Sequence, residues 1–180
     1  LALLREGHEV LAVESLPEIA ALLVERGVET VTVRPLDDLP AGSADTVLLL
    51  MNGLGLAGTL EGLQPLLESA VRLLAPGGRI VADSTDPRHF LELDAEDPVV
   101  GQDGRYEGEV QFQVEFEGSK GAPFPFLYVD AETLAKHASR AGLTLEAALP
   151  FENGTYLAIL ARSDDHDSGH DTATRLSEAG

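Results

Sequence analysis

The chain has 180 residues, of which 44% are hydrophobic, and its 31 acidic and 12 basic residues give a formal net charge of −19. This length fits one globular domain, and the negative charge argues against nucleic acids and membrane surfaces as partners. The absence of cysteine excludes disulfides and thiolate chemistry. We expect a cytoplasmic protein, because no apolar run approaches the roughly 18 residues of a bilayer span and no signal-peptide pattern occurs.

The first 44 residues alternate between helix and strand patterns. The opening segment, ending at Gly7, resembles the last turns of an amphipathic helix, so we expect one strand, one loop and part of this helix upstream of Leu1. Pro17 suits the first turn of the next helix, and Ile19 and Leu22 belong to its expected apolar face. The predicted elements are strand 8–14, helix 17–26, strand 28–33 and loop 34–44.

Residues 45–86 predict a β-α-β crossover, the unit around which the rest is arranged. Residues 46–51 are apolar on both faces, as in a central parallel strand, and residues 59–74 carry leucines three and four apart, as on one face of a helix. We expect Thr59 to cap this helix and Pro76-Gly77-Gly78 to end it before a strand at 79–83. Ligands of such sheets bind at the carboxyl ends of the strands.

The second half predicts a β-arm and a closing hairpin. Residues 87–104 have no clear period and predict a loop or short turns, whereas 106–117 alternate strictly and 124–129 return as a second strand. The remaining predictions are a β-arm insertion at about 87–129, helix 130–141, strands 144–149 and 155–161, and a disordered acidic tail at 163–180. Together these elements predict an open, mostly parallel Rossmann-like α/β sheet with helices on both faces, over a domain of residues 1–162.

Two patterns suggest ligand-binding chemistry. Glu14 ends a predicted strand, where its two carboxylate oxygens could accept hydrogen bonds from both hydroxyls of a ribose; the alternative is a surface glutamate. Gly53, Gly55 and Gly58 form a literal G-x-G-x-x-G between a strand and a helix, with Asp83 at the end of the next strand. This pattern is typical of a dinucleotide pyrophosphate loop, but a flexible turn beside a ligand bound elsewhere would give the same glycines.

Three longer segments carry a family resemblance. HEVLAVESLPEIAALLVERGV (8–28), DDLPAGSADTVLLLMNGLG (37–55) and LLAPGGRIVADSTD (73–86) resemble a class I S-adenosylmethionine-dependent methyltransferase without its N-terminal part. The stretch from Tyr106 to about residue 160 resembles the C-terminal half of a bacterial subgroup of small methyltransferases. The resemblance covers almost all of residues 1–161.

The resemblance implies S-adenosyl-L-methionine as the cofactor. It assigns Glu14 to the ribose, Leu36 and Asp37 to the adenine, and Met51, Asn52 and Gly53 to the wall beside the transferable methyl group. In that case the G-x-G-x-x-G is not a pyrophosphate loop. The family's glycine-rich loop after its first strand is absent from the given sequence, which implies impaired cofactor binding by this chain.

The implied reaction is direct methyl transfer to a small-molecule nucleophile, in which the protein supplies proximity and alignment. If a base is used, Asp83 or Asp86 is the candidate, and Ser84 and Tyr128 are candidate substrate contacts. No metal site is predicted. Two rival functions are an NAD-dependent oxidoreductase, using the three glycines and Asp83, and a non-catalytic α/β domain.

Overall fold

The computed structural model describes residues 2–28, 31–32, 35–92, 94, 99–101 and 103–163. It divides into two compact units, Leu1–Ala41 and Gly42–Gly180, and the tail predicted to be disordered lies almost wholly outside the described residues. The single domain predicted over residues 1–162 stays a prediction. Within the described ranges, no helix combines the length and apolar character needed to cross a membrane.

The first unit contains the predicted alternation of helices and strands. β1 and β2 pair in parallel, with Val13 opposite Thr32. Of α2, Ala20 alone is buried, while Ile19 and Leu22 are 41% and 40% exposed. The expected apolar face is therefore only half covered, because the described part of this unit offers a single pair of two-residue strands to pack against. The elements are α1 (Ala2–Arg5), β1 (Ala12–Val13), α2 (Pro17–Glu25), β2 (Val31–Thr32) and the 3-10 helix η1 (Leu36–Asp38).

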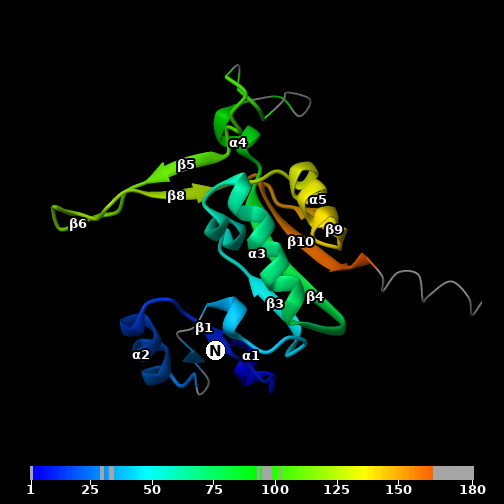
Figure 1. The fold of residues 1–180 in the computed structure, drawn as a ribbon. Coiled ribbons are helices and arrows are strands. Elements are labelled where there is room, and N and C mark those ends of the chain that lie inside the picture. Colours follow the sequence, from blue (N-terminus) through cyan, green and yellow to red (C-terminus); the bar gives the residue numbers. More distant parts are fainter. Residues whose placement is uncertain are drawn as a thin grey trace, which may run out of the picture. The chain divides into compact units, whose positions relative to one another are not determined.

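The second unit is built on a four-stranded sheet in the order β3-β4-β10-β9 (Figure 1). β3 and β4 are parallel, and β10 runs antiparallel to both β4 and β9. The predicted crossover and closing hairpin are both present, and the α/β fold class is confirmed. The elements are β3 (Ala44–Leu49), η2 (Gly53–Ala57), α3 (Leu60–Leu73), β4 (Leu74–Thr85), α4 (Pro87–Leu91), β5 (Glu109–Phe112), β6 (Glu115–Phe116), β7 (Ser119–Lys120), β8 (Phe124–Leu127), α5 (Ala131–Arg140), β9 (Leu143–Pro150) and β10 (Thr155–Arg162).

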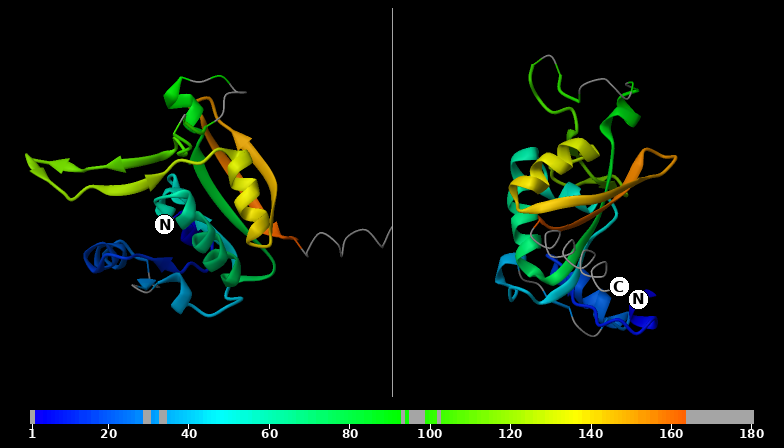
Figure 2. Two further views of the ribbon diagram at one scale, coloured as in Figure 1. Left: turned by 45° about the horizontal axis from the view of Figure 1, so that its top comes forward. Right: turned by 90° about the vertical axis from the view of Figure 1, so that its right-hand side faces the viewer.

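The core of this unit lies between the sheet and two helices. α3 and α5 lie side by side over one face of the sheet (Figures 1 and 2). The Thr59 hydroxyl accepts a hydrogen bond from the Gly62 N–H at 3.1 Å, which confirms the predicted cap of α3. The heptad-like spacing of α3 then turns its leucines inward. The buried side chains include Leu63, Leu67, Ala70 and Leu73 of α3, Leu134 and Ala138 of α5, and Ile80, Ala82, Ala158 and Leu160 of the sheet.

β3 differs from its prediction as a central strand buried on both faces. Among the described strands it pairs only with β4 and so lies at an edge of the sheet. Val47 and Leu49 are buried, but Leu48 and Leu50 on the opposite face are 43% and 46% exposed. The run of leucines therefore correctly predicted a strand but not its position.

Two boundaries were also predicted wrongly. α3 ends at Leu73 and β4 begins at Leu74, so the Pro76-Gly77-Gly78 segment lies within the first part of β4 and does not end the helix. Residues 87–91, predicted as loop or short turns, form the five-residue helix α4. Its start has a clear cause: Pro87 occupies the first turn, and the Asp86 side chain accepts a hydrogen bond from the Arg88 N–H at 2.9 Å.

The predicted arm contains an antiparallel ribbon formed by β5 and β8, called the ribbon below, and a smaller pair formed by β6 and β7 (Figure 1). In the ribbon, Phe112 lies opposite Phe124 and Val110 opposite Phe126. Side chains directly opposite one another share a face. One face of the ribbon is therefore apolar and mostly aromatic.

Candidate active site at the carboxyl ends of β3 and β4

The turn after β3 has an unusual backbone. Met51 and Asn52 both have left-handed conformations, with φ of +65° and +55°. Asparagine tolerates this region, but methionine rarely adopts it, and such strained residues concentrate at functional sites. Met51 is also 92% exposed. The strain and exposure together make this turn the first part of the candidate site.

Two hydrogen bonds join this turn to the end of β4. The Thr85 hydroxyl donates to Asn52 Oδ1 at 2.9 Å, and the Gly53 N–H donates to Asp83 Oδ1 at 3.2 Å. Asp83 is half-buried, and its second oxygen, Oδ2, has no hydrogen-bond partner among the described residues. That oxygen is available to accept a hydrogen bond or a proton from a bound molecule.

The glycine motif does not form an open anion-binding loop. It folds into η2, where the Gly55 N–H donates to the Asn52 carbonyl at 2.8 Å and the Gly58 N–H to the Gly55 carbonyl at 3.0 Å. The Leu60 N–H at the start of α3 donates to Glu109 Oε1 at 2.8 Å. A pyrophosphate at this helix terminus would meet a carboxylate already in place. The geometry therefore argues against the dinucleotide interpretation.

A glycine is needed at position 55 because the ribbon packs against its backbone, and not because a phosphate binds there. A Cβ on this residue would overlap the Phe126 ring at Cζ and Cε1. The Phe126 ring therefore covers the Gly55 backbone. This contact places the aromatic face of the ribbon directly beside the turn that contains Asn52 and Gly53.

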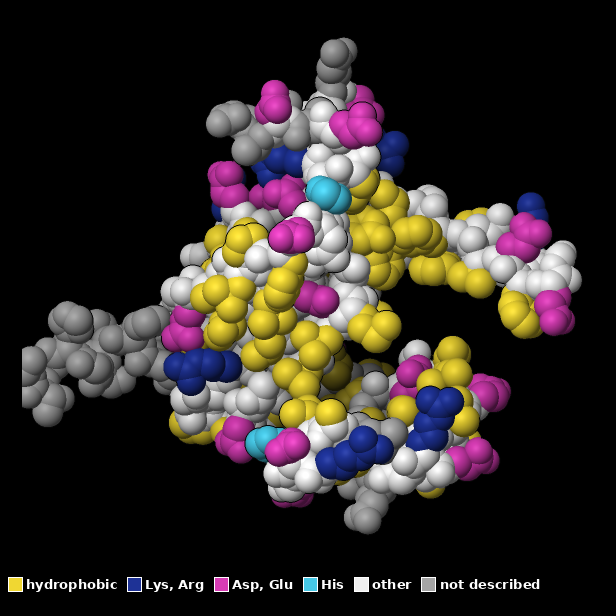
Figure 3. All heavy atoms as spheres, turned by 180° about the vertical axis from the view of Figure 1, so that it is seen from behind, with side chains coloured by type: hydrophobic (Ala, Val, Ile, Leu, Met, Phe, Trp, Pro, Cys, Tyr) yellow, Lys and Arg dark blue, Asp and Glu magenta, His cyan; other side chains and the backbone are white. Residues whose placement is uncertain are grey.

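Five aromatic side chains, from α4, β5, β8 and the residue after β8, form one cluster, called the aromatic cluster below. Tyr128, which follows β8, lies 5.2 Å from both Phe90 and Phe126 between ring centroids, and Phe112 lies 5.3 Å from Phe126 and 6.1 Å from Phe124. Three of the pairs are edge-to-face, which is a favourable geometry. Hydrophobic side chains follow the ribbon in Figure 3.

Ser84 was predicted to contact substrate, and its position contradicts that. It is fully buried, and its hydroxyl accepts a hydrogen bond from the Val129 N–H at 3.0 Å. The Val129 carbonyl in turn accepts from the Tyr156 hydroxyl at 2.8 Å. Ser84 thus anchors the end of the ribbon to β4. Tyr128 keeps its candidate role, because it is half-buried and its hydroxyl has no partner among the described residues.

A second buried network fixes the start of α5. The Tyr106 hydroxyl donates to Asp130 Oδ2 at 2.7 Å and accepts from the Asp130 N–H at 2.9 Å, while the Thr133 N–H donates to Asp130 Oδ1 at 3.0 Å. Burial raises the pKa of Asp130, but the hydrogen bonds from Thr133 and Tyr106 and the nearby Arg88 outweigh burial and hold the pKa below its usual value. Burial also raises the pKa of Tyr106, so this phenol stays a donor.

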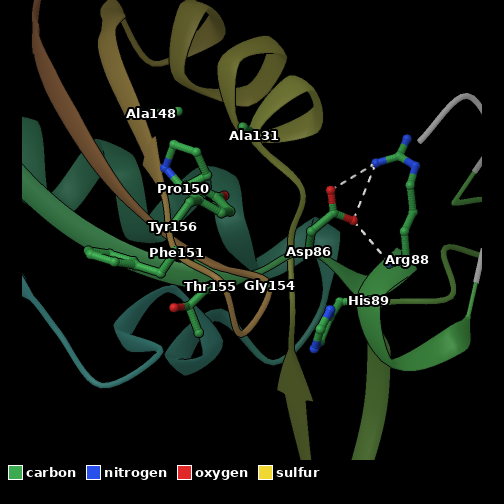
Figure 4. Close-up of a pocket in the computed structure, with 10 residues that line it drawn as sticks. All are labelled: Asp86, Arg88, His89, Ala131, Ala148, Pro150, Phe151, Gly154, Thr155 and Tyr156. Atoms are coloured by element: carbon green, nitrogen blue, oxygen red, sulfur yellow. Dashed lines mark hydrogen bonds and ion pairs between the residues drawn. The ribbon is translucent and has the colours of Figure 1, made fainter. Parts of the chain in front are cut away.

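Asp86 lies at a separate shallow pocket of about 420 Å³ between α4, α5 and the β9–β10 turn (Figure 4). Its Oδ1 caps α4, and its Oδ2 lies 3.2 Å from Arg88 Nη1. The same guanidinium nitrogen lies 3.9 Å from Asp130 Oδ1. Both Asp86 oxygens therefore have a structural partner. This makes Asp86 a poor base, and Asp83 is the candidate that we retain.

The residues predicted to contact the ribose and adenine belong to the first unit. Glu14 follows β1, its N–H donates to the Thr32 carbonyl at 3.0 Å, and its Oε1 accepts from the Leu16 N–H at 3.0 Å. Its second oxygen has no partner among the described residues. Leu36 and Asp37 begin η1. The structure thus places Glu14 at the carboxyl end of a parallel strand, as predicted, and leaves its ligand untested.

Sequence reasoning missed several contributors to the candidate site. Glu109 bonds to a helix terminus 49 positions earlier in the chain, which no local pattern indicates. Phe90 and Phe112 join the aromatic cluster from two different elements. For Phe112, the strict alternation of residues 106–117 was a usable signal, because it predicted one apolar face of a strand.

Comparison with known proteins identifies the family. No protein-family model and no curated protein sequence matches the chain. Among solved structures, a SAM-dependent methyltransferase from Bacteroides fragilis in complex with S-adenosyl-L-homocysteine is 32% identical, with a TM-score of 0.74 over 89% of this chain. The chain belongs to the SAM-dependent methyltransferases. It spans 66% of the length of the Bacteroides fragilis protein.

More distant structures agree with this family fold. The CcbJ methyltransferase from Streptomyces caelestis is 17% identical, with a TM-score of 0.64 over 89% of this chain and 77% of its own. The glycopeptide N-methyltransferase MtfA, complexed with S-adenosyl-L-homocysteine, is 16% identical, with a TM-score of 0.61 over 88% of this chain and 76% of its own. At these identities the similarity shows the fold alone.

Proposed function

We propose that this methyltransferase-family chain transfers a methyl group from S-adenosyl-L-methionine to a small-molecule nucleophile. The observation that carries the proposal is the 32% identity, over 89% of the chain, to a methyltransferase that binds S-adenosyl-L-homocysteine. When bound, the cofactor supplies an electrophilic methyl group on a sulfonium. The protein's part is to hold the reactants in line and exclude water.

The chain's own residues fit this role within each unit. In the first unit, Glu14 offers a carboxylate oxygen without a partner among the described residues, which suits a ribose diol. In the second unit, the exposed and strained Met51–Asn52 turn stands next to Asp83. We assign Met51, Asn52 and Gly53 to the wall beside the methyl group. Asp83 is assigned to the nucleophile, whose proton it could accept.

The test is calorimetric titration of S-adenosyl-L-homocysteine into the full-length protein and into Glu14→Ala. We expect Glu14→Ala to weaken binding by at least tenfold, since hydrogen bonds to a charged group contribute roughly 1.5–3 kcal/mol. Glu18→Ala is the matched control, because Glu18 lies on the exposed first turn of α2. Equal affinities of Glu14→Ala and the unmodified protein would overturn the assignment of Glu14, and no binding by the unmodified protein would overturn the function.

A further inference from the structure

The aromatic cluster is open to solvent on one side. Phe90, Phe112 and Phe124 are 42%, 39% and 41% exposed, although each has at least one ring neighbour. Aromatic rings that pack against one another yet stay exposed in this way form a preformed apolar surface. In its centre, the Tyr128 hydroxyl has no hydrogen-bond partner among the described residues. The cluster therefore combines an apolar surface with one unused polar group.

Two contacts link this surface to the end of β4, where Asp83 lies. Phe126 covers Gly55, two residues after the Gly53 N–H that donates to Asp83 Oδ1. On the other side of β4, the Ser84 hydroxyl holds the Val129 N–H, so the residue after Tyr128 is fixed to the residue after Asp83. Two independent contacts thus tie the aromatic cluster to the end of β4. The rings and the Asp83 carboxylate are therefore held at the same end of β4.

The charges beside the cluster select against anions. Arg88, two residues before Phe90, is held by Asp86 and lies 3.9 Å from Asp130, so its charge is already matched. Asp83 contributes a carboxylate, and the whole chain carries a formal charge of −19. A carboxylate or phosphate ligand would therefore be repelled. A cationic or basic nitrogen would be attracted both by the carboxylate and by the ring faces.

We propose that the aromatic cluster and Asp83 bind the methyl acceptor, and that the acceptor is an amine attached to an aromatic or similarly apolar group. This inference rests on the proposed function. The amine lone pair forms the new N–C bond as the methyl C–S bond breaks, and the bonding pair goes to sulfur, which leaves the thioether product. An acceptor that binds as an ammonium must lose one proton before this attack, because the protonated nitrogen has no lone pair; Asp83 Oδ2 accepts that proton and passes it to water, and the methylated nitrogen then carries the positive charge.

The experiment is a ligand-detected NMR titration of 2-phenylethylamine, with no cofactor present, and of 3-phenylpropanoate as an anion of similar size. We expect the amine to bind at least tenfold more tightly than the anion. Asp83→Asn should reduce that preference by at least threefold, since it removes the charge but keeps an oxygen for the Gly53 N–H. Equal binding of amine and anion, or an unchanged preference in Asp83→Asn, would overturn the proposal.

The contribution of the aromatic rings to amine binding can be tested with two phenylalanines of the arm, one inside the aromatic cluster and one outside it. Phe112→Ala should weaken the binding of 2-phenylethylamine roughly two- to fivefold. Phe116→Ala should leave this binding unchanged, because Phe116 is 72% exposed and has no ring contact in the described part of the chain. Phe112→Leu serves if the alanine variant melts early, since leucine keeps apolar bulk without a ring face. Equal effects at the two positions, or full affinity in Phe112→Leu, would overturn the aromatic site.

The design separates this inference from the proposed function. Amine binding is measured without cofactor, and S-adenosyl-L-homocysteine binding is measured without amine. If S-adenosyl-L-homocysteine binds but the amine does not, the acceptor class is wrong and the methyltransferase function stands. If the amine binds in the predicted manner and S-adenosyl-L-homocysteine does not, the aromatic site stands and the methyl-transfer role is overturned.

Discussion

The carboxylate of Glu109 accepts a hydrogen bond from the backbone N–H of Leu60, with 2.8 Å between Oε1 and N. This bond joins the first residue of β5 to the first residue of α3. The N-terminus of a helix carries partial positive charge, so a carboxylate there is doubly favourable. The contact fixes the ribbon beside the candidate site and occupies the position that a dinucleotide phosphate would need.

Removing this carboxylate should destabilise the second unit. We expect Glu109→Ala to lower the free energy of unfolding by about 1–2 kcal/mol, because a partly buried N–H loses a charged acceptor. Urea denaturation followed by circular dichroism measures the change. Glu115→Ala is the control, because its ion pair with Lys120 is more than half exposed and should contribute less than about 0.5 kcal/mol. Equal losses in the two variants would show that the contact has no special role.

The Gly55 contact can be tested by adding one methyl group. Gly55→Ala should cost about 1–3 kcal/mol, because the new Cβ would overlap the Phe126 ring. A double variant with Phe126→Ala should lose less than the sum of the two single variants, since the smaller side chain leaves room. Thermal unfolding gives all three values. Gly121→Ala is a mild control, because its Cβ would meet Val114 O at an ordinary 3.5 Å. Strict additivity would contradict the packing described for this pair.

The Tyr106 hydroxyl makes two buried hydrogen bonds with Asp130. Tyr106→Phe should therefore destabilise the protein by about 1–3 kcal/mol, because a buried carboxylate loses a donor and a buried N–H loses its acceptor. Chemical denaturation measures the effect. Tyr128→Phe removes a hydroxyl without a partner among the described residues and should change stability by less than about 0.5 kcal/mol. A Tyr106→Phe variant as stable as Tyr128→Phe would contradict the network.

The lowered pKa of Asp130 predicts a pH dependence of stability. Because the folded-state pKa lies below the unfolded value of about 3.9, the stabilisation by the ionised carboxylate is fully present above that value. It is lost as pH falls through the folded-state pKa. Asp130→Asn should therefore be less stable than the unmodified protein at pH 7, and the difference should shrink as pH falls below about 4. A constant difference between pH 7 and pH 3 would show that Asp130 ionisation contributes nothing.

The parts of the structure that local patterns control were predictable. The leucine spacing of α3, its Thr59 cap and the Asp130 cap of α5 all depend on residues within one or two turns. The same holds for the strand at Leu143–Pro150 and its hairpin partner. Asp86 and Pro87 also carry a local signal for α4, as a capping carboxylate followed by a first-turn proline.

The candidate site depended on contacts between distant residues, and these could not be predicted. Phe126 covers Gly55 across 71 positions, and Glu109 bonds to Leu60 across 49. By its spacing alone the glycine motif fits a phosphate loop; the family resemblance argued against that role, but only the contact with Phe126 shows why Gly55 is needed. Whether Ser84 is buried depended in the same way on Val129, which approaches from another element. Each of these roles follows from packing, and one chain position gives no information on its packing partner.

The most direct test of the central claim is calorimetric titration of the full-length protein with S-adenosyl-L-homocysteine, with NAD as the comparison ligand. The account predicts binding of S-adenosyl-L-homocysteine with a dissociation constant below about 100 μM, roughly −5.5 kcal/mol of binding free energy, and no binding of NAD. Binding of NAD alone would contradict the methyltransferase function and would favour pyrophosphate binding by the glycine motif. Binding of neither ligand would favour a non-catalytic domain that keeps the fold.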